Sequence, residues 1–142
     1  MKIFIGSDHA GYELKGEIKS LLNGIAEVED VGCDSTDSCD YPDFAHALAN
    51  KLKENSMATG ILICGSGNDI SIAANKHAHI RAALCWNTEL AELAVQHNNA
   101  NVLSLPARFV STELAKEIVN VFINSKFEGG RHERSTNKIP VA

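Results

Sequence analysis

Short apolar runs alternate with longer amphipathic segments along the chain. The runs fit buried strands, and the segments, whose apolar residues recur every three or four positions, fit helices. The predicted strands cover 2–6, 26–31, 60–64, 80–85 and 101–105, and the predicted helices cover 12–22, 44–54, 70–76, 87–97 and 112–125. This order predicts an α/β fold in which helices cover both faces of a five-stranded parallel sheet.

Helix start signals support this pattern. Asn87 or Thr88, and Ser111 or Thr112, each stand before a glutamate at the start of a predicted helix. Such residues are favoured as N-caps, and an acidic first turn complements the helix dipole.

Composition fits one compact domain covering 1–142. The chain has 142 residues, of which 44% are hydrophobic, and a net charge of −5. That charge disfavours nucleic acid as a partner, because duplex binding needs a clustered basic surface. No apolar run approaches the roughly 20 residues of a membrane span, and no signal peptide is recognisable, so we expect a cytoplasmic protein. The four cysteines lack paired metal spacing, and we expect free thiols.

Polar side chains follow the predicted strands. Asp8 and His9 come after the first strand, Tyr41 closes a long acidic loop after the second, and Cys64 ends the third; His97 and Asn98 follow the fourth helix. Singly, each has a structural explanation, such as Asp8 capping a helix and His97 complementing a helix C-terminus. Since ligands bind beyond the carboxyl ends of parallel strands, we expect these groups to converge on one edge.

The loop "CGSGNDI" (64–70) follows the third strand. It fails the dinucleotide-binding pattern, it lacks the Gly-Lys-Ser/Thr ending of a P-loop, and a C-x5-R phosphatase loop would need arginine at position 70. Backbone N–H groups at a helix start still fit a phosphate or an oxyanion. A helix N-terminus also favours the thiolate of a nearby cysteine, so Cys64 is either a base or nucleophile or an inert buried thiol.

The C-terminal segment "KFEGGRHERSTNKIPVA" is polar and contains Arg131 and Arg134. It fits either a disordered end or an ordered tail that reaches a partner subunit. These arginines, with Arg108 between the last predicted strand and helix, fit a local anion site, although exposed arginines also pair with solvent or carboxylates.

Six blocks of the sequence follow one another along the chain: "GSDHAG", "DYPDFA", "ILICGSGNDISIAANK", "IRAALC", "QHNNANVL" and "FEGGRH". Together they resemble the ribose-5-phosphate isomerase B family, which includes galactose-6-phosphate isomerase subunits. The resemblance covers nearly the whole chain in order. It implies a Rossmann-like three-layer sandwich and a homodimer or a dimer of dimers, with active sites at the subunit interface. It also implies conversion of ribose 5-phosphate to ribulose 5-phosphate through an enediolate, without metal or cofactor.

The resemblance also implies residue roles. Cys64 resembles the base, and His97, with Asp8 nearby, resembles the group that opens the sugar ring. The enediolate oxygen would be held by the loop formed by Gly65, Ser66, Gly67, Asn68 and Asp69. Phosphate would be held by His9, Arg108 and Arg131, and Tyr41 and Asn98 would line the sugar. We expect the tail, 127–142, to contact the partner subunit.

Three positions qualify the resemblance. Some members use a glutamate as base where this chain has Ile70, which leaves Cys64 as the base in this loop. The family usually has glycine at Asp69, and an arginine is often found at Ser135, for which Arg134 is a substitute. The alternatives are the same chemistry on a hexose 6-phosphate and a non-catalytic domain that binds a phosphate ligand.

Overall fold

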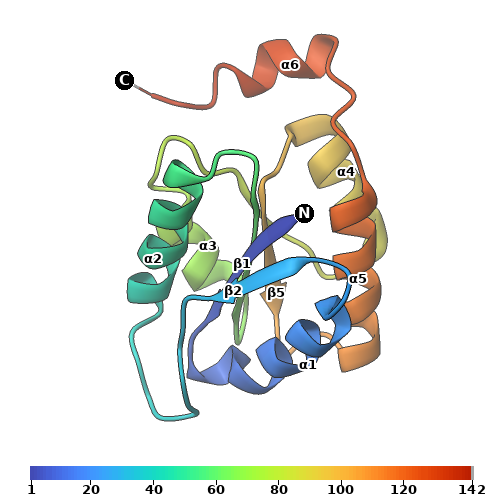
Figure 1. The fold of residues 1–142 in the computed structure, drawn as a ribbon. Coiled ribbons are helices and arrows are strands. Elements are labelled where there is room, and N and C mark those ends of the chain that lie inside the picture. The colour runs from blue at the N-terminus through green and yellow to red at the C-terminus, as the bar shows by residue number, and fades with distance from the viewer. Residues whose placement is uncertain (142) are drawn as a thin grey trace.

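A computed structural model describes residues 1–141, and Ala142, the last residue of the predicted tail, lies outside the described residues. Five parallel strands form one sheet in the order β2-β1-β3-β5-β4 (Figure 1). The strands are β1 (Lys2–Ser7), β2 (Glu27–Asp30), β3 (Thr59–Cys64), β4 (Ala82–Leu84) and β5 (Val102–Pro106). The predicted parallel sheet is confirmed, and its central strands are the most buried.

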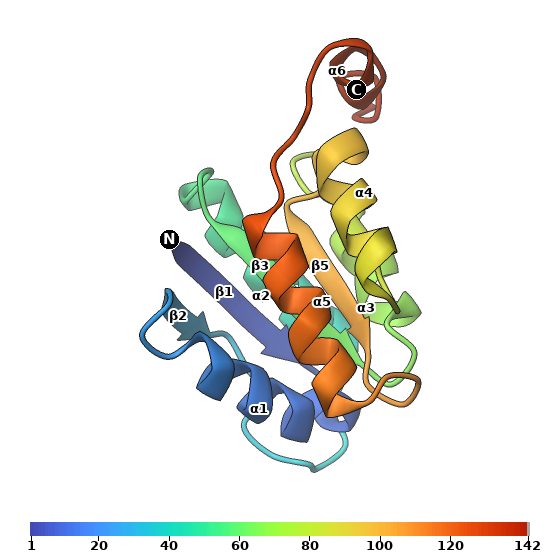
Figure 2. The same cartoon turned by 90° about the vertical axis from the view of Figure 1, so that its right-hand side faces the viewer.

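Helices cover both faces of the sheet, as predicted. On one face α1 (Tyr12–Leu22), α4 (Thr88–Asn98) and α5 (Thr112–Asn124) enclose one apolar core, and on the other α2 (Tyr41–Glu54) and α3 (Asn68–Ala74) enclose a second (Figure 2). The predicted caps are present: Asn87 accepts a hydrogen bond from the Leu90 N–H, and Ser111 accepts one from the Leu114 N–H.

Two helical segments differ from the sequence-based expectation. Helix α2 begins at Tyr41, three residues before the predicted start, because Pro42 fits a first helical turn, where its missing N–H costs nothing. The C-terminal tail, for which no helix was predicted, contains a short helix, α6 (Arg131–Thr136), which packs near the C-terminal end of α4. Within residues 1–141 no helix is both long and apolar enough to span a membrane.

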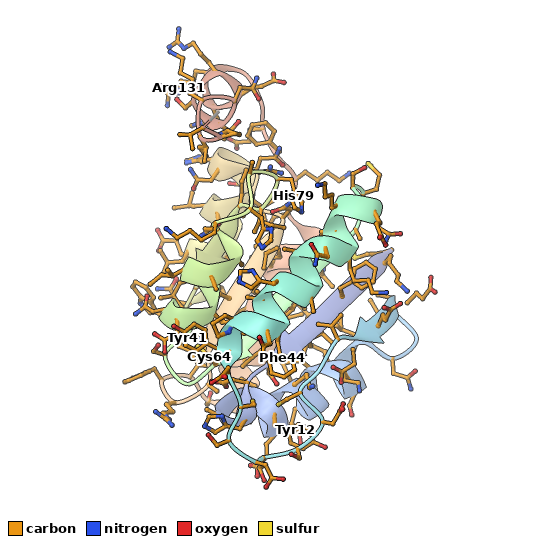
Figure 3. The ribbon with its side chains drawn as sticks, turned by 90° about the vertical axis from the view of Figure 1, so that its left-hand side faces the viewer. Tyr12, Tyr41, Phe44, Cys64, His79 and Arg131 are labelled. Atoms are coloured by element: carbon orange, nitrogen blue, oxygen red, sulfur yellow. The ribbon has the colours of Figure 1, made fainter. Side chains whose placement is uncertain are left out.

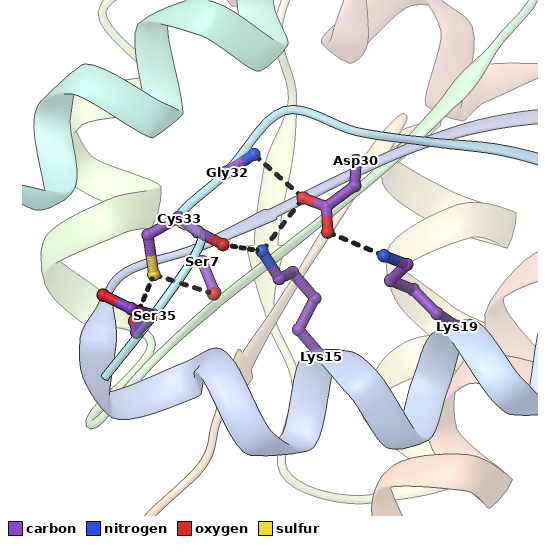
Figure 4. A network of polar contacts seen from close by, with 7 residues as sticks. All are labelled: Ser7, Lys15, Lys19, Asp30, Gly32, Cys33 and Ser35. Atoms are coloured by element: carbon purple, nitrogen blue, oxygen red, sulfur yellow. Dashed lines mark hydrogen bonds and ion pairs between the residues drawn. The ribbon is translucent and has the colours of Figure 1, made fainter. Parts of the chain in front are cut away.

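A buried lysine ties the loop after β2 to helix α1 (Figure 4). Lys15 is only 1% exposed; its ammonium group lies 2.9 Å from an Asp30 oxygen and also donates to the carbonyl of Cys33. Lys19 binds the other oxygen of Asp30 at 2.9 Å, and the Gly32 N–H donates to the same carboxylate. These contacts satisfy a buried charge and fix the start of the loop that leads to Tyr41.

Candidate active site

The carboxyl ends of β1 and β3 meet at the point where the strand order reverses. β1 has β2 on one side and β3 on the other, so the connections that follow these two central strands diverge, and open α/β sheets bind ligands at such a point. Ser7 pairs with Ile63, which places Asp8 beside Cys64, and the Asp8 N–H donates to the Ile63 carbonyl at 3.2 Å. Asp8 is buried and also accepts a hydrogen bond from the Gly11 N–H, so it caps the turn, as its structural explanation predicts.

Cys64 is the last residue of β3 and is 1% exposed. Its sulfur accepts a hydrogen bond from the Gly67 N–H at 3.1 Å. Gly67 has φ +77°, and a Cβ there would stand 2.4 Å from Leu84 Cδ1, so only glycine fits the turn that delivers this N–H. A donor aimed at the sulfur stabilises negative charge on it, which is what a cysteine base requires.

Some backbone N–H groups of the 65–69 loop donate hydrogen bonds within the loop itself. The Asn68 N–H donates to the Ser66 hydroxyl at 3.2 Å, so it and the Gly67 N–H are already used inside the loop. Asp69 is exposed in the first turn of α3, and its backbone has no positive φ, so the glycine usual at this position is not needed for backbone geometry. Its carboxylate there complements the helix dipole.

His9 follows Asp8 in a turn of 3-10 helix and is half-buried. Its Nδ1 lies 3.3 Å from the Cys39 N–H, which donates to it. A neutral imidazole that accepts at Nδ1 carries its proton on Nε2, so Nε2 is left as a donor. The Cys39 thiol lies 3.8 Å from the same nitrogen, and burial raises its pKa.

Arg108 follows β5 and is held by the loop it faces. Its backbone N–H donates to the Gly65 carbonyl at 3.0 Å. A Cβ on Gly65 would stand 3.1 Å from Arg108 Cζ, so the guanidinium lies against the bare glycine backbone. Tyr41, at the first position of α2, packs against the core cluster that contains Cys64. Arg108 and Tyr41 therefore join Asp8, His9 and Cys64 at this edge.

His97 and Asn98 lie at the other end of the sheet. They end α4, and the chain then enters β5 at Val102, whereas Cys64 pairs with Pro106 at the far end of that strand. Four steps of about 3.3 Å make a separation of about 13 Å along the strand alone. The expectation that all these groups converge on one edge is wrong for a single chain, because helices between parallel strands run back to the amino edge.

The tail arginines lie with His97. Helix α6 packs near α4, and Figure 3 places Arg131 at the opposite end of the molecule from Cys64 and Tyr41. Arg131 and Arg134 are exposed, and no carboxylate of residues 1–141 forms an ion pair with either guanidinium. Sequence reasoning missed two neighbours of His97 here, Glu128 and His132, although both flank Arg131 within the block "FEGGRH".

The site residues thus form two groups. The Cys64 half contains Asp8, His9, Tyr41, Cys64, the loop 65–69 and Arg108. The His97 half contains His97, Asn98, Glu128, Arg131, His132 and Arg134. One half offers a shielded thiol and backbone donors, and the other offers imidazoles and free guanidinium groups.

Comparison with known proteins shows similarity over nearly the whole chain. The sequence model of the Ribose/Galactose Isomerase family matches residues 3–139. The chain belongs to this family. The ribose-5-phosphate isomerase B of Escherichia coli is 45% identical over 139 residues, which cover 97% of this chain and 93% of that protein.

Solved structures of members of the Ribose/Galactose Isomerase family have the same fold. The ribose 5-phosphate isomerase of Thermotoga maritima is 50% identical, with a TM-score of 0.95 over 98% of this chain and 97% of that chain. The enzyme of Mycoplasma genitalium, solved with bound ribulose-5-phosphate, is 47% identical, with a TM-score of 0.93 over 97% and 93%. Such scores over nearly the full length confirm the predicted three-layer α/β fold of this family member.

Proposed function

We propose that this chain is an aldose-ketose isomerase that interconverts ribose 5-phosphate and ribulose 5-phosphate, with Cys64 as the base. The observation that carries the proposal is the buried Cys64 sulfur, which receives the Gly67 N–H at the switch point of the sheet. Family membership and the isomerases of closely similar structure support the same reaction.

The reaction moves one proton between neighbouring carbons. In the open-chain aldose, the Cys64 thiolate takes the proton from C2, and the electrons flow to O1 to form an enediolate. The thiol then returns the proton to C1 while the O2 proton is lost and O1 is protonated, which gives the ketose without an oxidant or a reductant. Unused N–H groups of the 65–69 loop, with Ser66, stabilise the charge on the enediolate oxygen.

The active site is completed by a second copy of the chain. The Cys64 half lacks the expected ring-opening group, His97, and the expected phosphate ligand Arg131, and the His97 half lacks the proposed base, Cys64. A homodimer that places the His97 half of one copy over the Cys64 half of the other supplies both. His97, with Asp8 across the interface, then opens the ring, Arg131 joins His9 and Arg108 on the phosphate, and the tail contacts the partner subunit.

The family description names both ribose and galactose, so a hexose 6-phosphate is a second candidate substrate. Arg134 is a secondary phosphate ligand in either case, and Tyr41 and Asn98 line the sugar. We place the reaction in pentose phosphate metabolism in the cytoplasm, which stays a prediction.

The test compares Cys64→Ala with the wild-type protein. Formation of ribulose 5-phosphate from ribose 5-phosphate is followed, with galactose 6-phosphate and allose 6-phosphate as competing substrates. We expect Cys64→Ala to lower kcat by about 100-fold or more, because general acid–base groups contribute roughly 10²–10⁴-fold. Cys85→Ala is the matched control: it removes another buried thiol, whose pKa burial raises to about 12. Unchanged activity of Cys64→Ala refutes the proposed base.

A further inference from the structure

Three side chains of the His97 half meet at one carboxylate. Glu128 Oε1 lies 3.6 Å from His97 Nε2 and 3.8 Å from His132 Nε2. The two imidazole rings are stacked, with centroids 4.2 Å apart and planes inclined by 10°. Both rings therefore present the same nitrogen to one oxygen.

The backbone holds this arrangement in place. The Glu128 N–H donates to the Gln96 carbonyl at 3.0 Å, which fastens the start of the tail beside His97. The His132 N–H donates to the Gly129 carbonyl at 3.1 Å, which sets His132 in the first turn of α6. The first contact places Glu128 against the end of α4, and the second sets the turn of the tail that leads to His132.

The same three residue types also form zinc sites, and their ligand atoms lie within 4.8 Å of one another. The ring geometry opposes that use. An imidazole ligand points its lone pair, within the ring plane, at an ion about 2 Å away, and two nearly parallel rings with centroids 4.2 Å apart cannot both do so. Glu128 Oε1, at 3.6 and 3.8 Å, stands farther from the rings than an ion would, so a smaller departure from each ring plane lets both Nε2 atoms face it.

From these contacts we propose that Glu128 and His132 are positioning residues that orient His97 and fix its tautomer for ring opening. This inference rests on the proposed function. With Nε2–H directed at Glu128, the neutral ring of His97 carries its lone pair on Nδ1, where it exchanges a proton with the sugar. The carboxylate also stabilises the imidazolium formed when Nδ1 takes that proton, and His132 keeps the ring from rotating by stacking on it.

The distances are consistent with an unliganded site. They exceed a direct hydrogen bond by a few tenths of an ångström, and catalytic contacts often shorten only when substrate is bound. Glu128 is exposed in the single chain, and its carboxylate acts more strongly once a partner copy covers it and excludes water.

Substrate choice separates positioning from a structural role. Ribose 5-phosphate is a closed furanose that must be opened, whereas ribulose 5-phosphate cannot close, because O5 is phosphorylated and O4 would give a four-membered ring. Deuterium uptake from D₂O into C1 of ribulose 5-phosphate therefore needs Cys64 but no ring opening. We expect Glu128→Gln to lower kcat for ribose 5-phosphate about tenfold and to leave the deuterium uptake unchanged.

Matched variants complete this assay. Glu133→Gln removes the same charge from an exposed site on α6 and is expected to change neither rate. His132→Phe keeps a stacked ring without the second N–H and is expected to lose less activity than His132→Ala. An equal fall of both rates in Glu128→Gln, or no fall in either, overturns the proposal.

A spectroscopic measurement tests the inference without activity. The ¹⁵N shifts of the His97 ring in the wild-type protein should report a proton on Nε2, and Glu128→Gln should give a mixture of tautomers. A wild-type His97 protonated on Nδ1 alone overturns the inference. If the wild-type protein turns over neither pentose phosphate, the proposed function fails, and the ring spectrum still decides the positioning of His97.

Discussion

Cys64 and His97 stand at opposite ends of β5 in the same chain. Cys64 pairs with Pro106 where the strand ends, and His97 lies in the last turn of the helix that leads into its start. Neither side chain reaches the other, because about 13 Å of strand separates the two ends. The proposed chemistry needs both groups at one substrate and therefore requires a second copy of the chain.

Arg131→Ala should mainly raise KM. Arg131 is exposed and has no carboxylate partner within residues 1–141, so its guanidinium is available for the phosphate dianion. Loss of this fork-shaped donor is expected to raise KM about tenfold with a smaller change in kcat. Lys138→Ala, an exposed cation farther along the tail, serves as the control in the same steady-state assay. A KM equal to that of the wild-type protein removes Arg131 from the phosphate site.

Gly67→Ala should destabilise the protein by more than backbone strain alone. Its φ is +77°, and the added methyl would stand 2.4 Å from Leu84 Cδ1 and 3.2 Å from the backbone at Leu105. Gly24 has φ +82° with no atom within 4 Å of its would-be Cβ, so Gly24→Ala measures the strain by itself. We expect urea unfolding to show a loss of unfolding free energy of about 1 kcal/mol for Gly24→Ala and about 2–4 kcal/mol for Gly67→Ala. Equal losses of unfolding free energy in the two variants would mean that the loop around Gly67 moves to accommodate the added methyl group.

The Asp30 carboxylate should make stability depend on acid pH. Burial alone would raise its pKa, but hydrogen bonds from the Lys19 and Lys15 ammonium groups outweigh it and hold the pKa below its ordinary value of 3.8. A lowered folded-state pKa gives stability that is present above 3.8 and is lost as the pH falls through the folded value.

Asp30→Asn should therefore cost most near neutral pH, and its difference from the wild-type free energy of unfolding should shrink below about pH 4. Urea unfolding from about pH 6 to about pH 2 measures this, with exposed Asp37→Asn as the control. A difference that stays constant over the whole range contradicts the assigned role of the carboxylate.

Much of the fold could be predicted because hydrophobic periodicity and caps are local. The helix at 12–22 has the predicted bounds, and Asn87 and Ser111 cap as expected. The predicted strand at 80–85 shrinks to Ala82–Leu84, since an edge strand pairs on one side only. Helix α6 was not predicted because its six residues are all polar and carry no apolar period.

The site could be predicted by residue but not by arrangement. The expectation that residues at strand ends meet was correct for Asp8 and Cys64, since the carboxyl ends of parallel strands lie at one edge of the sheet. The same logic failed for His97, which ends a helix and lies at the other edge. Glu128 was missed because its role depends on contact with α4, which no spacing within the tail encodes. Whether the backbone at position 69 requires glycine could likewise be decided only from the structure, in which Asp69 has no positive φ.

The most direct test of a site shared between two copies is complementation. Cys64→Ala and His97→Ala should each be nearly inactive alone, but a mixed dimer should have one site with both native groups. Random co-assembly of equal amounts makes half of the dimers mixed, and one of the two sites in each mixed dimer has both native groups. About a quarter of the wild-type activity should therefore return. Cys64→Ala mixed with Asp8→Ala is the control, because both changes fall in the same half and no native site can form. Recovery in the first mixture alone supports the shared site, whereas no recovery in either mixture, with mixed dimers present, contradicts it.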